Sequence, residues 1–234
     1  PRSQLLEFSY PPSHAITLLL PYFYGDHDHY WGAKGFQELA AFIGLIPLVL
    51  IGGSIPFFRR LSIEGKVGWI LILVAIIFAT GRYSPIYSQL IEHQVITTFG
   101  VAGRFVFFFV LGSILLTPAA FDLAMSLRKK RQKMRFALFA AITPLVLLVP
   151  FFRLLVRSTP ELRQMKALFA SLDVYLLTVL ITIAILLYVS TRWIWSNYSI
   201  KNQVTTFFIP IFACLTLLLY SWHYNPVVPA ARAY

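Results

Sequence analysis

An alternating run of acids and imidazoles, Asp26-His27-Asp28-His29, holds the residue types of this 234-residue chain that come nearest to metal or polar-ligand chemistry. Carboxylate oxygens and imidazole nitrogens suit several divalent ions. Adjacent residues of an extended stretch point to opposite sides, so four in a row rarely converge on one ion. A solvated polar loop and a ligand-contacting loop both stay open, and we assign neither a metal nor a cofactor to it.

Two arginines, Arg82 and Arg104, bracket one loop between apolar segments. The fixed fork of a guanidinium matches phosphate oxygens and stays charged at any working pH. Gly81, Gly100 and Gly103 beside them would allow the backbone to approach a ligand closely. The pair is therefore a candidate phosphate site. The alternative is that both side chains simply extend to lipid headgroups.

The remaining charged and reactive positions favour structural roles. Asp122 lies near the end of an apolar run and within two helical turns of Arg128, which predicts an interfacial ion pair. Arg153 is predicted to be an interfacial anchor, and the single cysteine, Cys214, an inert thiol in an apolar run. The sequence contains no Walker loop, HExxH or GxSxG motif.

Composition identifies the class of protein that positions these residues. Hydrophobic residues make up 58% of the chain and charged residues 12%, with a mean hydropathy of +0.72. Soluble domains carry roughly twice that share of charge. The apolar residues also form long runs, as in multi-span membrane proteins. We therefore predict an all-α membrane protein, a bundle of about six transmembrane helices with short interfacial helices.

The predicted spans lie at about residues 38–57, 67–80, 105–125, 136–155, 174–190 and 204–222. Residues 1–35 are predicted to be a non-cytoplasmic aromatic and polar shelf, and residues 223–234 an outer tail. In the shelf, residues 16–20 are too few to span and are closed by Pro21, which favours an interfacial or re-entrant piece.

A short amphipathic helix is predicted within the loop that Arg82 and Arg104 bracket. Its apolar residues recur at helical spacing. We expect Ile86, Leu90 and Ile91 to face inward.

The charge pattern predicts the orientation of the spans. Lys and Arg gather in three alternate connectors, at residues 59–66, 128–135 and 192–201. Cytoplasmic connectors carry such an excess, so both ends of the chain are predicted to be non-cytoplasmic. The net charge of +11 then reflects contact with anionic headgroups rather than nucleic acid.

The order of several motifs carries a resemblance to a known family. PYFYG, YWG and ELAAFIGLIPLVL are followed by ATGRYSPIYSQL, TFGVAGRFVFFF and AAFDLA. Over residues 11–127 the chain resembles the later half of the bacterial YfhO-like membrane proteins of the GT-C glycosyltransferase superfamily. The chain departs from the family in FGVAGR, where the family often has an Arg and a Pro before the outer-loop Arg.

The resemblance implies a membrane portion of a glycosyltransferase in the bacterial plasma membrane. Such enzymes transfer a sugar from a polyprenyl-phosphate carrier on the outer face. Arg82 and Arg104 would then meet the carrier phosphate, and Tyr24, Asp26, Asp28 and Trp31 the sugar or its acceptor. The family's catalytic acid lies in an earlier loop, so we expect a missing N-terminal part and no catalytic residue here. A non-catalytic scaffold subunit and a lipid or sugar flippase component are the alternatives.

Overall fold

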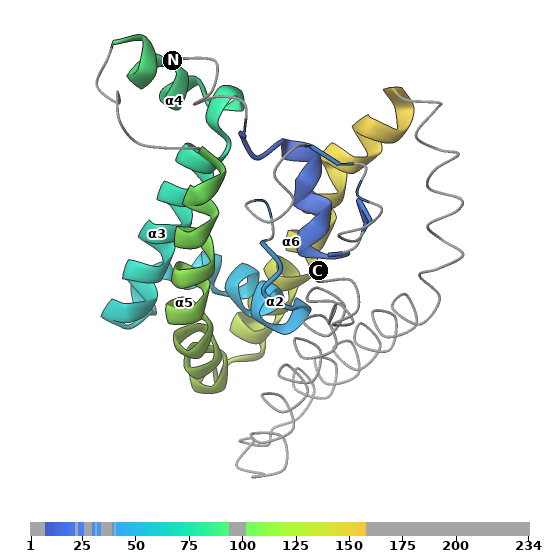
Figure 1. Ribbon diagram of the computed structural model, residues 1–234. Helices are drawn as coiled ribbons and strands as arrows, with labels where there is room; N and C mark the ends of the chain where they lie inside the picture. The colour runs from blue at the N-terminus through green and yellow to red at the C-terminus, as the bar shows by residue number, and fades with distance from the viewer. Residues whose placement is uncertain are drawn as a thin grey trace, which may run out of the picture.

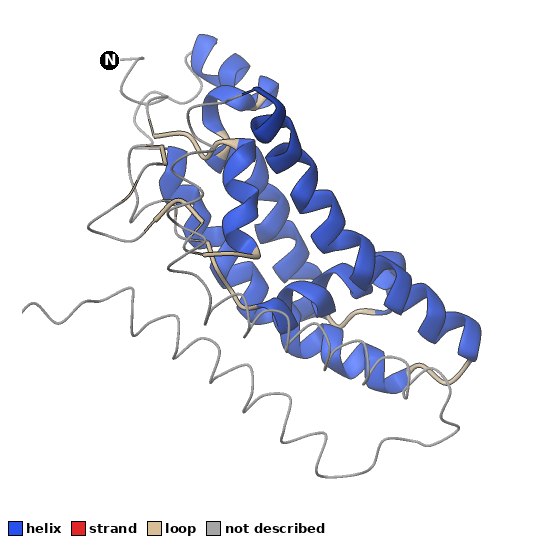
Figure 2. Cartoon of the chain, turned by 90° about the vertical axis from the view of Figure 1, so that its right-hand side faces the viewer, coloured by secondary structure: helices blue, strands red, loops and turns tan. Residues whose placement is uncertain are grey.

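The computed structural model describes residues 8–21, 23–25, 30, 32, 33, 39, 41–93 and 102–157. Every regular element within these ranges is a helix, which confirms the all-α prediction for this part of the chain (Figure 2). The elements are the 3-10 helix η1 (Pro12–Leu18), α2 (Leu45–Ser54), η2 (Ile55–Arg60), α3 (Ile63–Ala79), η3 (Gly81–Tyr83), α4 (Pro85–Glu92), η4 (Ala102–Phe105), α5 (Val106–Ser126) and α6 (Lys130–Arg157). The predicted spans at 174–190 and 204–222 lie outside the described residues.

Helices α3 and α5 form an antiparallel pair that crosses through glycine (Figure 1). A Cβ atom at Gly68 would lie 2.6 Å from the carbonyl oxygen of Gly112, and one at Gly112 would lie 2.6 Å from that of Gly68. The two backbones therefore touch, as they do where small residues line helix contacts in membranes. Ile72 and Leu116, only 2% and 0% exposed, fill the space beside the crossing.

Helix α6 packs against α2 through a second pair of glycines. A Cβ atom at Gly52 would meet the side chain of Thr143, and one at Gly53 would meet the ring of Phe136. The small helix η1 also lies against α6 (Figure 1). α2 also contacts α5, so it joins the α3–α5 pair to α6 and η1.

The predicted start of the first span is wrong. Gly44 has a φ of 91°, in the left-handed region, so α2 begins only at Leu45 rather than at residue 38. The second helix begins four residues earlier than predicted, at Ile63, because Ser62 Oγ accepts a hydrogen bond from the Gly65 N–H and caps it. The third span, predicted at 105–125, is confirmed as a helix in α5.

Within the described residues, one continuous helical segment, Ala102–Ser126, is long and apolar enough to cross a membrane. The pair Leu45–Arg60 and Ile63–Ala79 passes the same test of length and composition only when taken together, and it is bent by 120°. A broken span and a re-entrant segment would both have such a bend. The prediction of about six spans goes beyond these findings.

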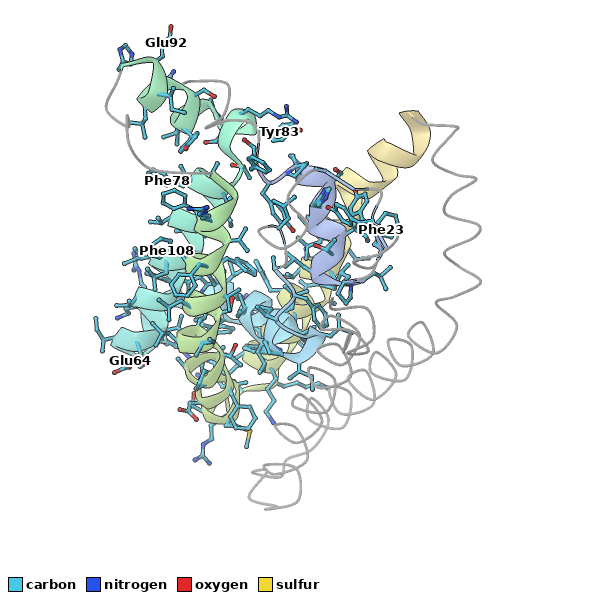
Figure 3. The ribbon with its side chains drawn as sticks, viewed as in Figure 1. Phe23, Glu64, Phe78, Tyr83, Glu92 and Phe108 are labelled. Carbon is cyan, nitrogen blue, oxygen red and sulfur yellow. The ribbon has the colours of Figure 1, made fainter. Side chains whose placement is uncertain are left out.

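The fold separates two ends, which differ in composition. We call the end that holds residues 79–93 and 102–105 the loop end, and the end that holds η2, the start of α3, the end of α5 and the start of α6 the basic end. Figure 3 labels Glu92 at the first and Glu64 at the second. The predicted alternation of basic and non-basic connectors is thus present for the first three connectors after α2.

Candidate ligand-binding site at the loop end

An extended segment from the start of the chain, residues 8–10, closes the loop end. It lies between the end of α3 and the start of η4, and Ser9 is only 2% exposed. Three hydrogen bonds hold it: Tyr10 N–H to Ala79 O (2.7 Å), Arg82 N–H to Ser9 Oγ (2.9 Å) and Gly103 N–H to Phe8 O (2.8 Å). Residues 8–10 therefore join the two helices of the central pair.

Gly81 makes this close approach possible. Its φ of +47° is in the left-handed region that favours glycine, and a Cβ atom there would meet Ser9 Oγ and the Cβ of Ala102. Any larger residue would push residues 8–10 out of place. The neighbour of Gly81 is the chain's own segment, so the predicted approach of a ligand at this glycine stays a prediction.

Arg82 and Arg104 lie on either side of residues 8–10, directly after Gly81 and Gly103, and both are exposed. Arg82 Nη2 donates to Tyr83 Oη at 2.9 Å, and its guanidinium lies 4.9 Å from the centroid of the Tyr83 ring. Tyr83 is labelled at this end in Figure 3. Within the described part of the chain, this bond uses one of the five N–H donors of Arg82. It orients the guanidinium without taking up its other donors.

A buried cluster of aromatic rings continues from Tyr10. The His14 ring stacks on Tyr24 with centroids 4.1 Å apart and planes 13° apart, and Tyr10 meets it edge-on at 6.0 Å. Tyr10 Oη and Thr17 Oγ1 both donate to the His14 carbonyl oxygen, at 2.8 and 2.7 Å. This polar core ties residues 8–10 to η1 and to Tyr24 within the predicted shelf.

His14 is neutral at pH 7 and has one tautomer. Its Nε2 accepts from the Ala33 N–H at 3.3 Å and lies 2.9 Å from Tyr30 Oη, so the proton is on Nδ1. Nδ1 is buried and has no hydrogen-bond partner within the described residues. Burial lowers the pKa of His14 to about 4 and raises the pKa values of Tyr10 and Tyr30 above their ordinary range. The imidazole and hydroxyl groups of this cluster are therefore neutral at pH 7 rather than charged.

Helix α4 confirms the predicted amphipathic helix and most of its inward face, since Ile91 is buried and Leu90 packs against the same cluster. Pro85 begins it, and Ser84 Oγ caps it by accepting from the Tyr87 N–H at 3.3 Å. Tyr87 and Ile91 are buried, with Tyr87 edge-on to Phe78. Ile86 is 50% exposed, so its predicted inward position is wrong. Residues 87 and 91 share one face at a spacing of four, and residue 86 is turned away from it.

The predicted ion pair of Asp122 is also wrong within the described residues. Asp122 is exposed and takes part in no ion pair there. Helix α5 ends at Ser126 and Leu127 is extended, so the chain turns away before Arg128 can lie two helical turns above Asp122. The described residues also contain no group of three His, Cys, Asp or Glu side chains that could hold a metal ion.

The remaining predicted ligand contacts are only partly described. Tyr24 is 4% exposed and belongs to the buried cluster, which connects to Arg82 through His14, Tyr10 and Ser9. Asp26, Asp28 and Trp31 lie outside the described residues, so their roles stay predictions. Sequence reasoning missed His14 and Thr17. The signal for both was their spacing in YPPSHAIT, because His14 lies four residues after Tyr10 and Thr17 three residues after His14.

Comparison of the chain with family models, with curated proteins and with solved structures found no match.

The neutral state of buried His14 makes stability depend on pH. The pKa of His14 is about 4 in the fold and about 6.5 in an unfolded chain. Between these values the unfolded chain binds more protons, so stability falls as the pH drops through this window, by at most about 3 kcal/mol. Thermal unfolding in detergent from pH 7 to 4 measures this loss. In His14→Gln the unfolding temperature should depend less on pH. An equal dependence on pH in both proteins would contradict the neutral state of buried His14.

Proposed function

We propose that these helices belong to a multi-pass membrane bundle. The support is the chemistry of their exposed faces. The exposed side chains along the helices are large and apolar, among them Ile70, Leu73 and Ile76 of α3, Phe107 and Ile114 of α5, and Leu138, Leu145 and Val146 of α6. A water-exposed helix carries polar residues on its outer face. From Trp69 to Phe78, α3 has no charged residue at all, and acyl chains are the surroundings that suit such a surface.

In this proposal the loop end faces the outside and the basic end the cytoplasm. The connectors with the dense Lys and Arg content, residues 59–66 and 128–135, meet at the basic end, whereas the loop end carries few charges. The excess of Lys and Arg in cytoplasmic connectors supports this orientation. Both α4 and the His14 cluster then lie at the outer interface.

We further propose that the loop end receives the phosphate of a polyprenyl-phosphate-linked sugar. One observation carries this: Arg82 and Arg104 follow two glycines on opposite sides of residues 8–10, held there by backbone hydrogen bonds. Two exposed guanidiniums at headgroup depth suit a phosphate that bears a sugar. The side chains of Asp26, Asp28 and Trp31 in the shelf suit sugar hydroxyls, whereas Tyr24 is buried. The chain is then the membrane portion of a GT-C-like glycosyltransferase.

The orientation is tested by single cysteines at the two ends, in a background with Cys214 replaced by serine. Ser126→Cys at the basic end and Gln89→Cys on α4 both place the thiol at an exposed position. In intact cells an impermeant thiol reagent should label position 89 and spare position 126, because only the loop end faces outward. Permeabilised cells provide the control, in which both positions should react. Labelling of 126 alone in intact cells would reverse the orientation.

The phosphate role is tested by substitutions that keep the charge. Arg82→Lys and Arg104→Lys should each weaken binding of a polyprenyl phosphate in nanodiscs about tenfold, because an ammonium lacks the two-pronged fork. Lys66→Arg at the basic end is the matched control and should bind like the unchanged protein. Native mass spectrometry measures the bound fraction. Unchanged binding in both loop-end variants would leave headgroup anchoring as their role and remove the carrier site from this proposal.

A further inference from the structure

The buried ring of Phe57 collects two guanidiniums from different elements at the basic end. Arg60, on the same helix η2, lies 5.8 Å from the ring centroid, and Arg135, on α6, lies 5.9 Å from it. Phe57 is 6% exposed and stacks on Phe136 with centroids 6.5 Å apart. Each cation is attracted to the ring, and the packing of η2 against α6 holds both charges beside this one ring.

The two charges repel each other, and their surroundings add to the repulsion. Nine Lys and Arg residues lie in 59–66 and 128–135, namely Arg59, Arg60, Lys66, Arg128, Lys129, Lys130, Arg131, Lys133 and Arg135. The carboxylates nearest in sequence are Glu64 and Asp122. Both are exposed, and Asp122 forms no ion pair within the described residues. Such a surface attracts anions strongly.

Large apolar side chains are exposed beside this basic surface, and they indicate which class of anion would bind there. Phe58, Met125, Met134 and Leu138 are 42%, 37%, 52% and 56% exposed. A free inorganic anion would gain nothing from these side chains. A molecule with a phosphate head and hydrocarbon tails would contact both the guanidiniums and these apolar side chains.

We propose that Arg60 and Arg135, held on Phe57, bind the phosphate of an anionic phospholipid of the membrane. The headgroup phosphate contacts the guanidiniums and compensates their charge, and the acyl chains run along the exposed side chains of α5 and α6. This site is distinct from the loop end. It rests on the membrane part of the proposed function and is independent of sugar transfer.

The test separates a built site from general attraction by a basic surface. The full chain is placed in nanodiscs of phosphatidylcholine with a minor share of phosphatidylglycerol, and the lipids retained after detergent extraction are counted by native mass spectrometry. Arg60→Gln with Arg135→Gln should lower phosphatidylglycerol retention tenfold or more. Arg59→Gln with Arg128→Gln removes the same charge from the same surface and should lower it less than twofold. Equal losses in the two pairs would overturn the proposal.

Two further measurements test the same site without the double variant, which could fail to fold. Phe57→Leu keeps every charge but removes the ring, and it should lower phosphatidylglycerol retention severalfold; full retention would overturn the proposal. Inorganic phosphate at millimolar concentration should not displace the lipid, and displacement would show a free-anion site instead. A chain that does not enter the bilayer at all would refute the membrane proposal, whereas insertion without lipid preference would refute only this inference.

Discussion

The loop end depends on the hydrogen bonds that residues 8–10 make with two helix termini. The last carbonyls of a helix lack partners within the helix, and buried amides without partners are costly. Tyr10 supplies a donor to Ala79 O, while Ser9 and Phe8 supply acceptors to the amides of Arg82 and Gly103. A segment 73 residues away in sequence from Arg82 thus completes the termini. The backbone positions of both loop-end arginines follow from it.

The glycine contacts between helices position the rest of the fold relative to the loop end. Contact of Gly68 with Gly112 sets how closely α3 and α5 approach, and Gly52 and Gly53 do the same for α2 and α6. With backbones in contact, the helices cannot slide without a clash. The distance between the loop end and the basic end is therefore set by the α3–α5 pair, and each end can hold its own arginines. An exposed tyrosine orients Arg82, whereas a buried phenylalanine gathers Arg60 and Arg135.

The all-helical character of the described part of the chain and the presence of α4 and α5 could be predicted from the sequence. Long apolar runs and helical spacing are local signals. The start of α2 could not, because it depends on the left-handed φ of Gly44. The exposure of Ile86 was not predicted, because Phe78 and Ala102, which are distant in sequence, select Tyr87 and Ile91 as the buried face of α4. For the site, the sequence places Arg82 and Arg104 at the two ends of one loop, and a shared ligand for them stays a prediction. The role of Ser9 and His14 was not, since hydrogen bonds between remote segments leave no periodic pattern.

Hydrogen exchange at the amides of Arg82 and Gly103 tests most directly whether residues 8–10 hold the loop end. Both amides should exchange slowly in the unchanged protein, because Ser9 Oγ and Phe8 O accept from them. Ser9→Ala removes one bond worth about 1 kcal/mol and should speed exchange at Arg82 about fivefold, while amides in the middle of α3 keep their rates. Exchange of both amides at the rate of a free peptide in the unchanged protein would contradict this account.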